Sequence, residues 1–126
     1  MLFGNQPFLA DATARALAGA AEVAQAMAAR FQTRAKTLKA RLDGVAGIRV
    51  SEPEAGMFAL LDIRASGLSG EAFALSLLEK EGVATMPGES FGRGLAGWLR
   101  LSLTRPDAVI AEAAEAIARF ASRRLA

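Results

Sequence analysis

A single arginine, Arg100, stands among apolar residues in the segment W-L-R-L-S-L, which covers residues 98–103. Strict alternation predicts a strand whose leucines face one side while Arg100 faces the other. A guanidinium group that leaves water without a partner is costly, so it is expected to bind an anion or to open onto a cleft. Its planar donors suit a carboxylate, which it can hold with two parallel hydrogen bonds. The alternative is an edge-strand arginine whose long stem carries the charge to water.

The residue types that the sequence lacks exclude several kinds of catalytic and metal-binding site. The chain contains no histidine, no tyrosine and no cysteine. Because of this it cannot form a Ser-His-Asp triad, a histidine or cysteine metal site, a disulfide or a phenolic acid or base. Glu52 and Glu54 flank Pro53, but no further ligands lie at a useful spacing, so no metal site is predicted. Any contribution to catalysis is expected to come from binding and positioning rather than from proton transfer.

Length and composition indicate one globular domain. The chain has 126 residues, of which 52% are hydrophobic and 22% charged, and this excludes wholesale disorder. A net charge of +2 gives little support for nucleic-acid binding, and the basic residues between positions 30 and 41 read as a solvated helix face. No segment reaches the roughly 18 consecutive apolar residues of a membrane span, and no secretory signal is recognisable. A cytoplasmic protein is the default expectation.

The elements that must position Arg100 follow from periodicity and from helix-ending residues. The fold class predicted is α+β, with a small mixed β-sheet and helices packed on it. Strand 57–63 is apolar at nearly every position, which predicts a central strand covered on both faces. Helices are expected at residues 8–18, 21–42, 70–80 and from about 106 onward, and strands at residues 48–50, 57–63, 83–86 and 98–103.

Helix boundaries have their own signals. Ser69 is expected to cap the third helix and Gly82 to end it, while Thr104 and Asp107 resemble a capping box for the last helix. The helix at 21–42 should be broken from the preceding one near Gly19. Three sets of apolar residues are expected to face the core: Val23, Met27, Phe31, Ala35, Leu38 and Leu42 in the second helix, Phe73, Leu77 and Leu78 in the third, and Ile110, Ala113, Ala114, Ile117, Phe120 and Ala121 in the last.

Two features point to surfaces that another part of a protein would cover. Leu2, Phe3 and Phe8 have no obvious core near them in the sequence, and no helix is clearly assigned to the sheet face that carries Trp98 and Arg100. The alternative is that the helix at 21–42 covers that face. Glu89, in the turn P-G-E-S-F-G, is expected to be a surface carboxylate.

Three runs together resemble one enzyme family. They are P-E-A-G-M-F-A-L-L-D-I, then F-A-L-S-L-L-E-K-E-G-V-A-T-M-P-G-E-S-F-G, then W-L-R-L-S-L. Their order and spacing resemble the C-terminal small domain of fold-type I, class I/II pyridoxal-phosphate aminotransferases, of the aspartate-like or arginine–pyruvate-like kind. The opening F-G-N-Q-P-F-L-A-D-A is similar to the loop and helix that follow the cofactor lysine in those enzymes. The resemblance implies that residues 1–20 belong to the large-domain or inter-domain region and that residues 21–126 form the small domain.

The resemblance also implies roles for individual residues. Arg100 matches the arginine that grips the α-carboxylate of the amino-acid or keto-acid substrate. Asn5 and Gln6 lie where family members direct a loop toward the cofactor phosphate of the neighbouring subunit of a homodimer, although both are equally plain loop residues. Residues 56–58 and 90–92 would line the substrate side, while burial habits place the Phe58 and Phe91 rings in the core.

The sequence departs from the family in one essential feature: it has no lysine in a setting like that of the family's cofactor lysine. The enzymes hold pyridoxal 5'-phosphate through a lysine. This chain has only Lys36, Lys39 and Lys80, all on helices expected to be exposed. We therefore expect a piece of an aminotransferase that neither holds the cofactor covalently nor turns over substrate alone. The alternative function is a free-standing α+β binding or regulatory module that uses Arg100 for a small carboxylate.

Overall fold

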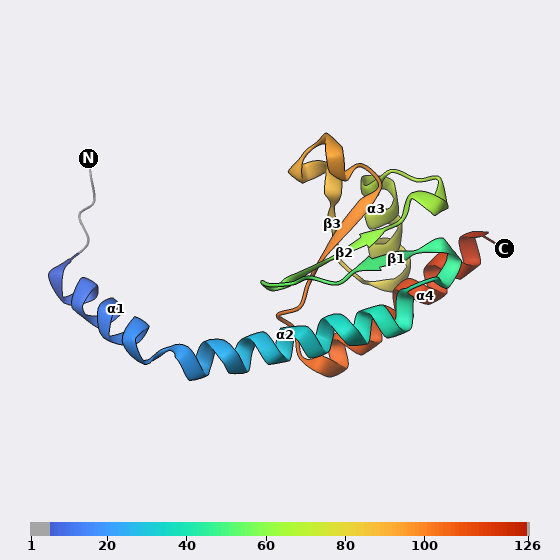
Figure 1. The fold of residues 1–126 in the computed structure, drawn as a ribbon. Coiled ribbons are helices and arrows are strands. Elements are labelled where there is room, and N and C mark those ends of the chain that lie inside the picture. The colour runs from blue at the N-terminus through green and yellow to red at the C-terminus, as the bar shows by residue number, and fades with distance from the viewer. Residues whose placement is uncertain (1–5, 126) are drawn as a thin grey trace. The chain divides into compact units, whose positions relative to one another are not determined.

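The computed structural model describes residues 6–125, and Figure 1 shows their order along the chain. The chain divides into two compact units, one ending at Arg30 and one beginning at Phe31. The α-helices are α1 (Pro7–Gly19), α2 (Ala21–Leu42), α3 (Gly70–Glu81) and α4 (Asp107–Leu125). The strands are β1 (Arg49–Ser51), β2 (Phe58–Asp62), β3 (Met86–Pro87) and β4 (Trp98–Ser102). Four short 3₁₀ helices are η1 (Val45–Gly47), η2 (Arg64–Ser66), η3 (Gly88–Phe91) and η4 (Arg93–Leu95).

The first unit is helical, and its described residues form no buried core. The predicted break is confirmed, because α1 ends at Gly19 and only Ala20 separates it from α2. Residues 6–30 include no buried residue. Val23 is 67% exposed and Met27 42% exposed, so the predicted apolar stripe is wrong for the first half of α2. Burial begins only in the second unit, where Ala35, Leu38 and Leu42 are fully buried.

The second unit contains a four-stranded sheet in the order β1-β2-β4-β3, with every pair of neighbours antiparallel. This confirms the α+β class, but the expectation of a mixed sheet was wrong in that detail. The reason is local: residues 52–57 return the chain from β1 to β2, and residues 88–97 return it from β3 to β4. Short returns of this kind place neighbouring strands antiparallel.

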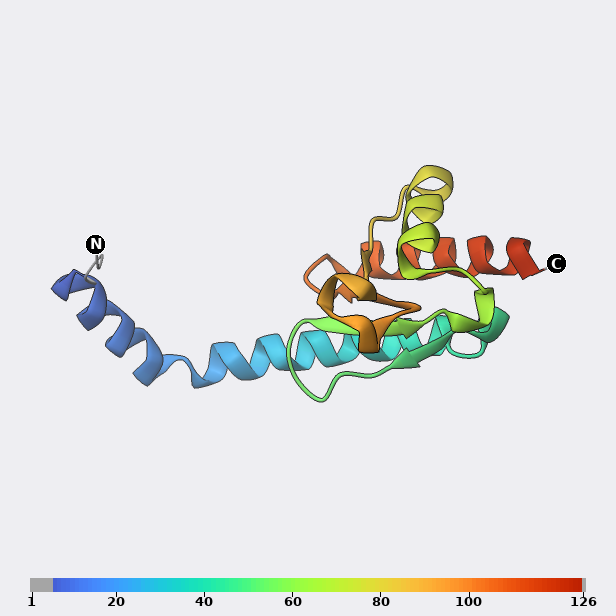
Figure 2. The same cartoon turned by 90° about the horizontal axis from the view of Figure 1, so that it is seen from above.

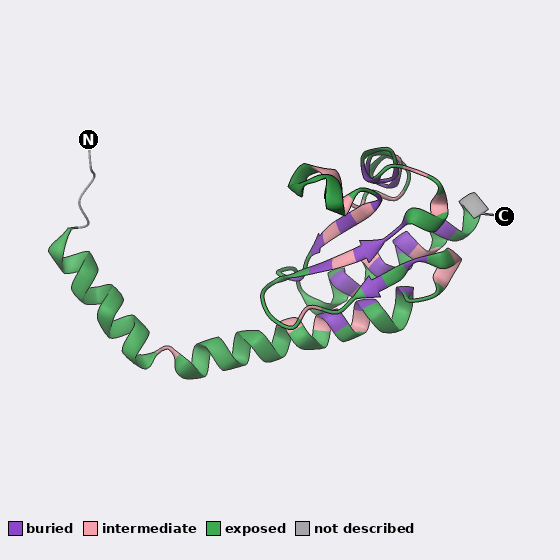
Figure 3. Cartoon of the chain, turned by 45° about the horizontal axis from the view of Figure 1, so that its top comes forward, coloured by how far each residue is buried: buried purple, intermediate pink, exposed green. Residues whose placement is uncertain are grey.

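The core lies on one face of this sheet. The alternate residues Ala59 and Leu61 of β2, and Leu99 and Leu101 of β4, are buried there. Helices α2, α3 and α4 supply the other half of the core, and Figure 3 shows the buried residues gathered between helices and sheet. Figures 1 and 2 show α4 beside the second half of α2, and the ion pairs Arg34–Asp107 and Arg41–Glu115 join these two helices.

The opposite face is only partly covered, so the expectation that β2 is buried on both sides is wrong. Phe58 is 39% exposed and Leu60 is of intermediate burial. The strand is central by its hydrogen bonds to β1 and β4, but α2, α3 and α4 pack on its other face. A strand that is apolar at nearly every position thus presents one apolar face outward. The alternative, in which the helix at 21–42 covers this face, is also wrong.

Helix α3 begins and ends as expected. The Ser69 hydroxyl accepts a hydrogen bond from the Ala72 amide at 3.2 Å. Gly82 ends the helix in a left-handed conformation (φ 69°), and its amide donates to the Leu78 carbonyl at 3.0 Å. Leu78 itself is 47% exposed, so it is not a core residue.

Two other local expectations are corrected. The third strand is limited to Met86–Pro87, because only these residues pair with β4. The capping box at the start of α4 does not form, since the helix begins only at Asp107. The Asp107 carboxylate pairs with Arg34 instead, and the Thr104 hydroxyl lies 2.8 Å from that of Ser102. The ion pair with Arg34 of α2 therefore takes the place of the predicted cap.

Candidate carboxylate-binding site

Arg100 lies in the middle of β4 on the partly exposed face of the sheet. The alternation predicted for this strand is confirmed, because Leu99 and Leu101 are buried whereas Arg100 is half-buried. Leu60 of β2 and Met86 of β3 pair with Arg100 across the sheet and therefore share its face. The guanidinium thus leaves the sheet from an interior strand rather than from an edge, contrary to the edge-strand alternative.

The Arg100 guanidinium has no carboxylate partner among the described residues. Within residues 6–125 it takes part in no ion pair and no side-chain hydrogen bond. Its carbon lies over two phenyl rings, 4.1 Å from the centroid of Phe58 and 4.2 Å from that of Phe91. Contacts at this distance are cation–π interactions. The group is held by aromatic rings while its hydrogen-bonding capacity stays unused.

Phe58 and Phe91 are brought together from two different parts of the chain. Phe58 begins β2, and Phe91 ends η3. They are 39% and 46% exposed, so the expectation of core rings is wrong for both. The guanidinium offers an aromatic face a favourable contact without full burial. The structure therefore brings one ring from each of the segments 56–58 and 90–92 against Arg100.

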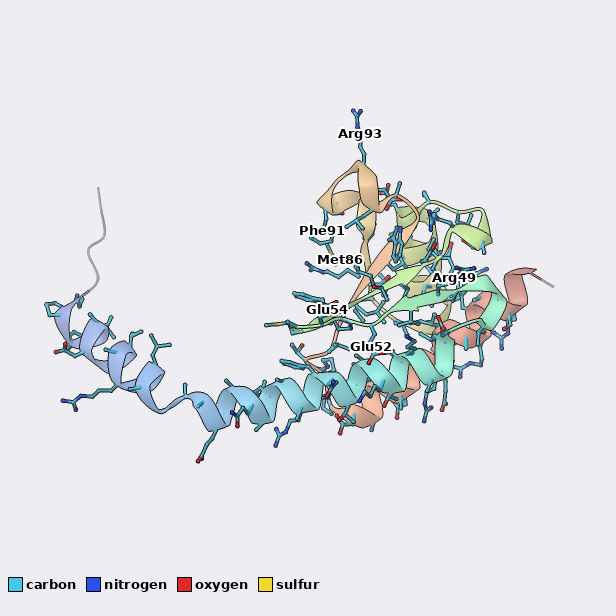
Figure 4. The ribbon with its side chains drawn as sticks, in the orientation of Figure 1. Arg49, Glu52, Glu54, Met86, Phe91 and Arg93 are labelled. Atoms are coloured by element: carbon cyan, nitrogen blue, oxygen red, sulfur yellow. The ribbon has the colours of Figure 1, made fainter. Side chains whose placement is uncertain are left out.

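The side chains of other residues near Arg100 point in different directions. Figure 4 shows Met86 and Phe91 projecting on the same side of the ribbon, while Arg93 points away from the domain. Met86 is 45% exposed and so extends the apolar surface around Arg100. The site thus combines one cation with methionine, leucine and two phenyl rings, a surface suited to an anionic group attached to an apolar body.

Glu89 was expected to be a surface carboxylate, and this expectation is wrong. Its Oε1 atom accepts hydrogen bonds from the backbone amides of Gly70 at 2.8 Å and Gly97 at 3.1 Å. The hydrogen bonds from Gly97, from its own amide and from Gly70 hold the pKa of Glu89 below its ordinary value. Because Gly70 is the first residue of α3, the carboxylate also lies at the positive end of that helix. Glu89 therefore fixes η3 and is unavailable to Arg100.

Gly88 fixes the same segment by its lack of a side chain. It is buried, and a Cβ atom there would collide with the Leu95 carbonyl oxygen and lie 2.9 Å from the Trp98 Cβ. Only glycine lets η3 approach β4 this closely. The position of Phe91 is consequently set by a close backbone contact at Gly88 and by the hydrogen bonds of Glu89.

A second charged pair on the same face was missed by sequence reasoning. Asp62, at the end of β2, accepts hydrogen bonds from Arg64 Nε at 2.9 Å and Arg64 Nη2 at 2.6 Å. The Arg64 side chain lowers the pKa of Asp62, against the effect of burial. Arg64 also lies over the Trp98 ring at 5.5 Å. Asp62 thus has its own arginine, and the D-x-R spacing was the only signal in the sequence.

The remaining predicted site residues lie elsewhere. Asn5 lies outside the described residues. Gln6 is exposed and precedes α1, where its side chain makes no capping hydrogen bond. The cofactor role expected of Asn5 and Gln6 stays a prediction.

The three lysines are exposed on helices that pack on the opposite face of the sheet from Arg100. Lys39 pairs with Glu52, and Lys80 lies over the Phe120 ring at 6.0 Å. None lies in an apolar pocket, where burial would favour the neutral, nucleophilic amine. The lysines of this chain therefore do not fit a covalent attachment to pyridoxal phosphate.

A cavity on the helix side of the sheet is separate from Arg100. It encloses about 650 Å³ and is lined by residues of α4, the end of α3 and the exposed end of β4, among them Glu81, Leu101, Arg105, Val109 and Arg119. The Glu81 carboxylate in its wall pairs with Arg119 and Arg123. The pair of arginines on Glu81 accounts for that carboxylate, and the cavity lies on the helix side of the sheet, away from Arg100.

Comparisons with known proteins identify the family of the chain. The family model for aminotransferase class I and II matches residues 1–117. This chain belongs to that family. The arginine–pyruvate transaminase AruH of Pseudomonas aeruginosa is 37% identical over 125 residues, which cover 99% of this chain and 32% of that enzyme. The aromatic aminotransferase of Pyrococcus horikoshii matches in structure with a TM-score of 0.70 and 28% identity, over 77% of this chain and 26% of that one.

A further structure is informative about the cofactor. The pyridoxal-phosphate-bound putative aminotransferase of Clostridium difficile matches with a TM-score of 0.62 and 28% identity, over 74% of this chain and 23% of that one. Pyridoxal 5'-phosphate is the cofactor of this aminotransferase family. The chain spans less than a third of the length of each of these relatives. None of the helices within residues 6–125 has the length and hydropathy that crossing a bilayer requires.

Proposed function

We propose that this chain supplies the substrate-carboxylate-binding part of a pyridoxal-phosphate-dependent aminotransferase, which moves an amino group between an amino acid and a 2-keto acid. Arg100 holds the carboxylate that both substrates share. The observation that supports this most directly is a half-buried guanidinium that pairs with no carboxylate of residues 6–125, on the sheet face opposite to the core formed with α2, α3 and α4. An arginine that served only to stabilise the fold would be expected to pair with a carboxylate of its own chain.

The residues present indicate which part of the reaction this chain performs and which part needs the cofactor. Pyridoxal phosphate supplies the electron sink on which amino-group transfer depends. Arg100 binds and orients the substrate with two parallel hydrogen bonds, which lowers the entropic cost of bringing the reacting groups together. Lys36, Lys39 and Lys80 are exposed and away from Arg100, so the chain alone is expected neither to hold the cofactor covalently nor to catalyse transfer.

The wider assembly is part of the same proposal. We assign residues 1–20 to the large-domain or inter-domain region and residues 21–126 to the C-terminal small domain of a cytoplasmic homodimer. Asn5 and Gln6 would then direct their loop toward the cofactor phosphate of the neighbouring subunit. The exposure of Phe8, Leu17 and Val23, at 65%, 73% and 67%, supports an origin in a larger assembly, because such residues normally have a partner.

The binding part of the proposal is tested by titrating the ¹⁵N-labelled chain with sodium acetate and sodium pyruvate and following its NMR spectrum. We expect shifts confined to β4, the start of β2 and η3, with a Kd of about millimolar, as suits one bidentate contact. Arg100→Lys should weaken binding about tenfold, because lysine lacks the planar fork. Arg93→Lys is the matched control, since Arg93 is exposed and points away. Equal binding by the Arg100→Lys variant would reject the role of Arg100.

The cofactor part is tested by incubation with pyridoxal phosphate followed by borohydride reduction and mass spectrometry. We expect only scattered, substoichiometric modification of exposed amines. One stoichiometric adduct at a single lysine would contradict the statement that the chain cannot hold the cofactor.

A free-standing carboxylate-binding module is the second candidate, because Arg100 by itself serves that function equally well. It predicts a monodisperse chain that binds little apolar dye. The aminotransferase proposal predicts self-association and strong dye binding through the exposed residues of α1 and α2. Light scattering combined with dye fluorescence separates the two.

A further inference from the structure

The orientation of Arg100 depends on few contacts. Its long side chain has several rotatable bonds, and within residues 6–125 no hydrogen bond or ion pair fixes the guanidinium. The guanidinium contacts the rings of Phe58 at 4.1 Å and Phe91 at 4.2 Å. These two rings are therefore the contacts that can set the orientation of the guanidinium.

We propose that Phe58 and Phe91 are positioning residues that hold the plane of the Arg100 guanidinium, so that its N–H edge is presented to the substrate carboxylate. This inference rests on the carboxylate-binding role proposed above. A ring that lies over a guanidinium contacts its face, whereas all its N–H donors lie in its plane. Aromatic contact on the face therefore leaves the hydrogen-bonding edge available, which an ion pair with an internal carboxylate would not.

The two rings are themselves held in place. Phe58 lies in β2, where its strand pairs with β4 through the register Phe58↔Ser102 and Leu60↔Arg100. Phe91 ends η3, which the Glu89 carboxylate ties to the amides of Gly70 and Gly97. Both anchors lie within this chain and do not involve a substrate. The guanidinium is thus pre-organised before the carboxylate arrives, and pre-organisation reduces the ordering cost of binding.

The surroundings also define the kind of substrate that fits. Met86 and Leu60, which pair with Arg100 across the sheet, are apolar, and Met86 is 45% exposed. A second carboxylate on the substrate would find no further free cation among the residues that contact Arg100. This side of the site accordingly suits one carboxylate carried by an apolar or neutral body.

The test replaces each ring by an apolar side chain of similar reach. Phe58→Leu and Phe91→Leu, singly and together, remove the aromatic face and retain hydrophobicity. We expect acetate binding to weaken about two- to fivefold for each ring and roughly tenfold or more for both, as cation–π contacts at exposed sites imply. Phe8→Leu is the matched control, because it makes the same change at an exposed phenylalanine of α1, outside the carboxylate-binding site; its acetate affinity should equal that of the unmodified chain.

A second measurement reports on the arginine without any ligand. In the unmodified chain, ring currents from Phe58 and Phe91 should shift the Arg100 Nε–Hε NMR signal away from the position of an exposed arginine. Each leucine variant should move that signal toward the exposed position, and Arg100→Lys identifies it by its disappearance. Since both rings are partly exposed, the variants should keep the amide spectrum of the core.

The outcomes distinguish this inference from the proposed function. If acetate binds to the unmodified chain and to both leucine variants equally, the rings do not position Arg100, while the carboxylate role stands. If acetate binding does not depend on Arg100 at all, the proposed function fails. An Nε–Hε signal that stays in place in both leucine variants overturns the inference in either case.

Discussion

The Glu89 carboxylate and the Gly70 amide are joined by a hydrogen bond of 2.8 Å, which links η3 to the first residue of α3. A second bond from Gly97, 3.1 Å long, links the same oxygen to the residue that precedes β4. One acidic side chain thus connects three segments, and Phe91 lies two residues further along the chain. The position of an aromatic ring against Arg100 depends in this way on a carboxylate that never touches it.

Replacing Glu89 by glutamine should destabilise the domain by about 1–2 kcal/mol at neutral pH, because charge-assisted hydrogen bonds to two amides are weakened. The folded-state pKa of Glu89 lies below its ordinary value of 4.5. Its contribution should therefore be complete above that value and be lost as the pH falls through the lower folded-state value. Urea unfolding of both proteins between neutral pH and pH 3 measures this.

The matched control for this experiment is Glu54→Gln, because Glu54 is exposed in the loop between β1 and β2. It should change the free energy of unfolding by less than about 0.5 kcal/mol at any pH. A Glu89→Gln variant whose stability difference stays constant down to pH 3 would show that the carboxylate is not held in the charged form.

Gly88→Ala should cost about 2 kcal/mol or more, since a methyl group there collides with the Leu95 carbonyl and with Trp98. The control is Gly94→Ala, where a Cβ would meet no atom within 4 Å. Thermal unfolding of the two variants gives the difference directly. If Gly88→Ala retains the stability of the parent, η3 does not pack against β4 as described.

The two faces of the sheet should respond differently to truncation. Leu99→Ala removes a fully buried side chain and should cost about 2–5 kcal/mol. Met86→Ala, on the face of Arg100, removes a side chain that is 45% exposed and should cost less than about 1 kcal/mol. Chemical denaturation of both variants tests this, and equal losses would mean that the outer face is covered as thoroughly as the inner one.

The sequence alone was sufficient for most of the regular elements and for the side of its strand on which Arg100 lies. Alternation in the segment W-L-R-L-S-L placed Arg100 opposite Leu99 and Leu101, because side chains in a strand alternate by geometry. Ser69 and Gly82 bounded α3, because capping depends on the local backbone and on the residue types beside it. The quoted runs also indicated the aminotransferase family.

Only the tertiary structure decided which surfaces are buried and which charges pair. Strand β2 is apolar at nearly every position, and nothing in its sequence said that helices would cover just one face. Glu89 is a half-buried structural acceptor, and Asp107 pairs with Arg34 instead of forming the expected cap, because their partners come from distant segments. The contact of Phe58 and Phe91 with Arg100 has the same origin. Local patterns fix backbone geometry, whereas the free energy of burying or pairing a side chain depends on neighbours that only folding brings together.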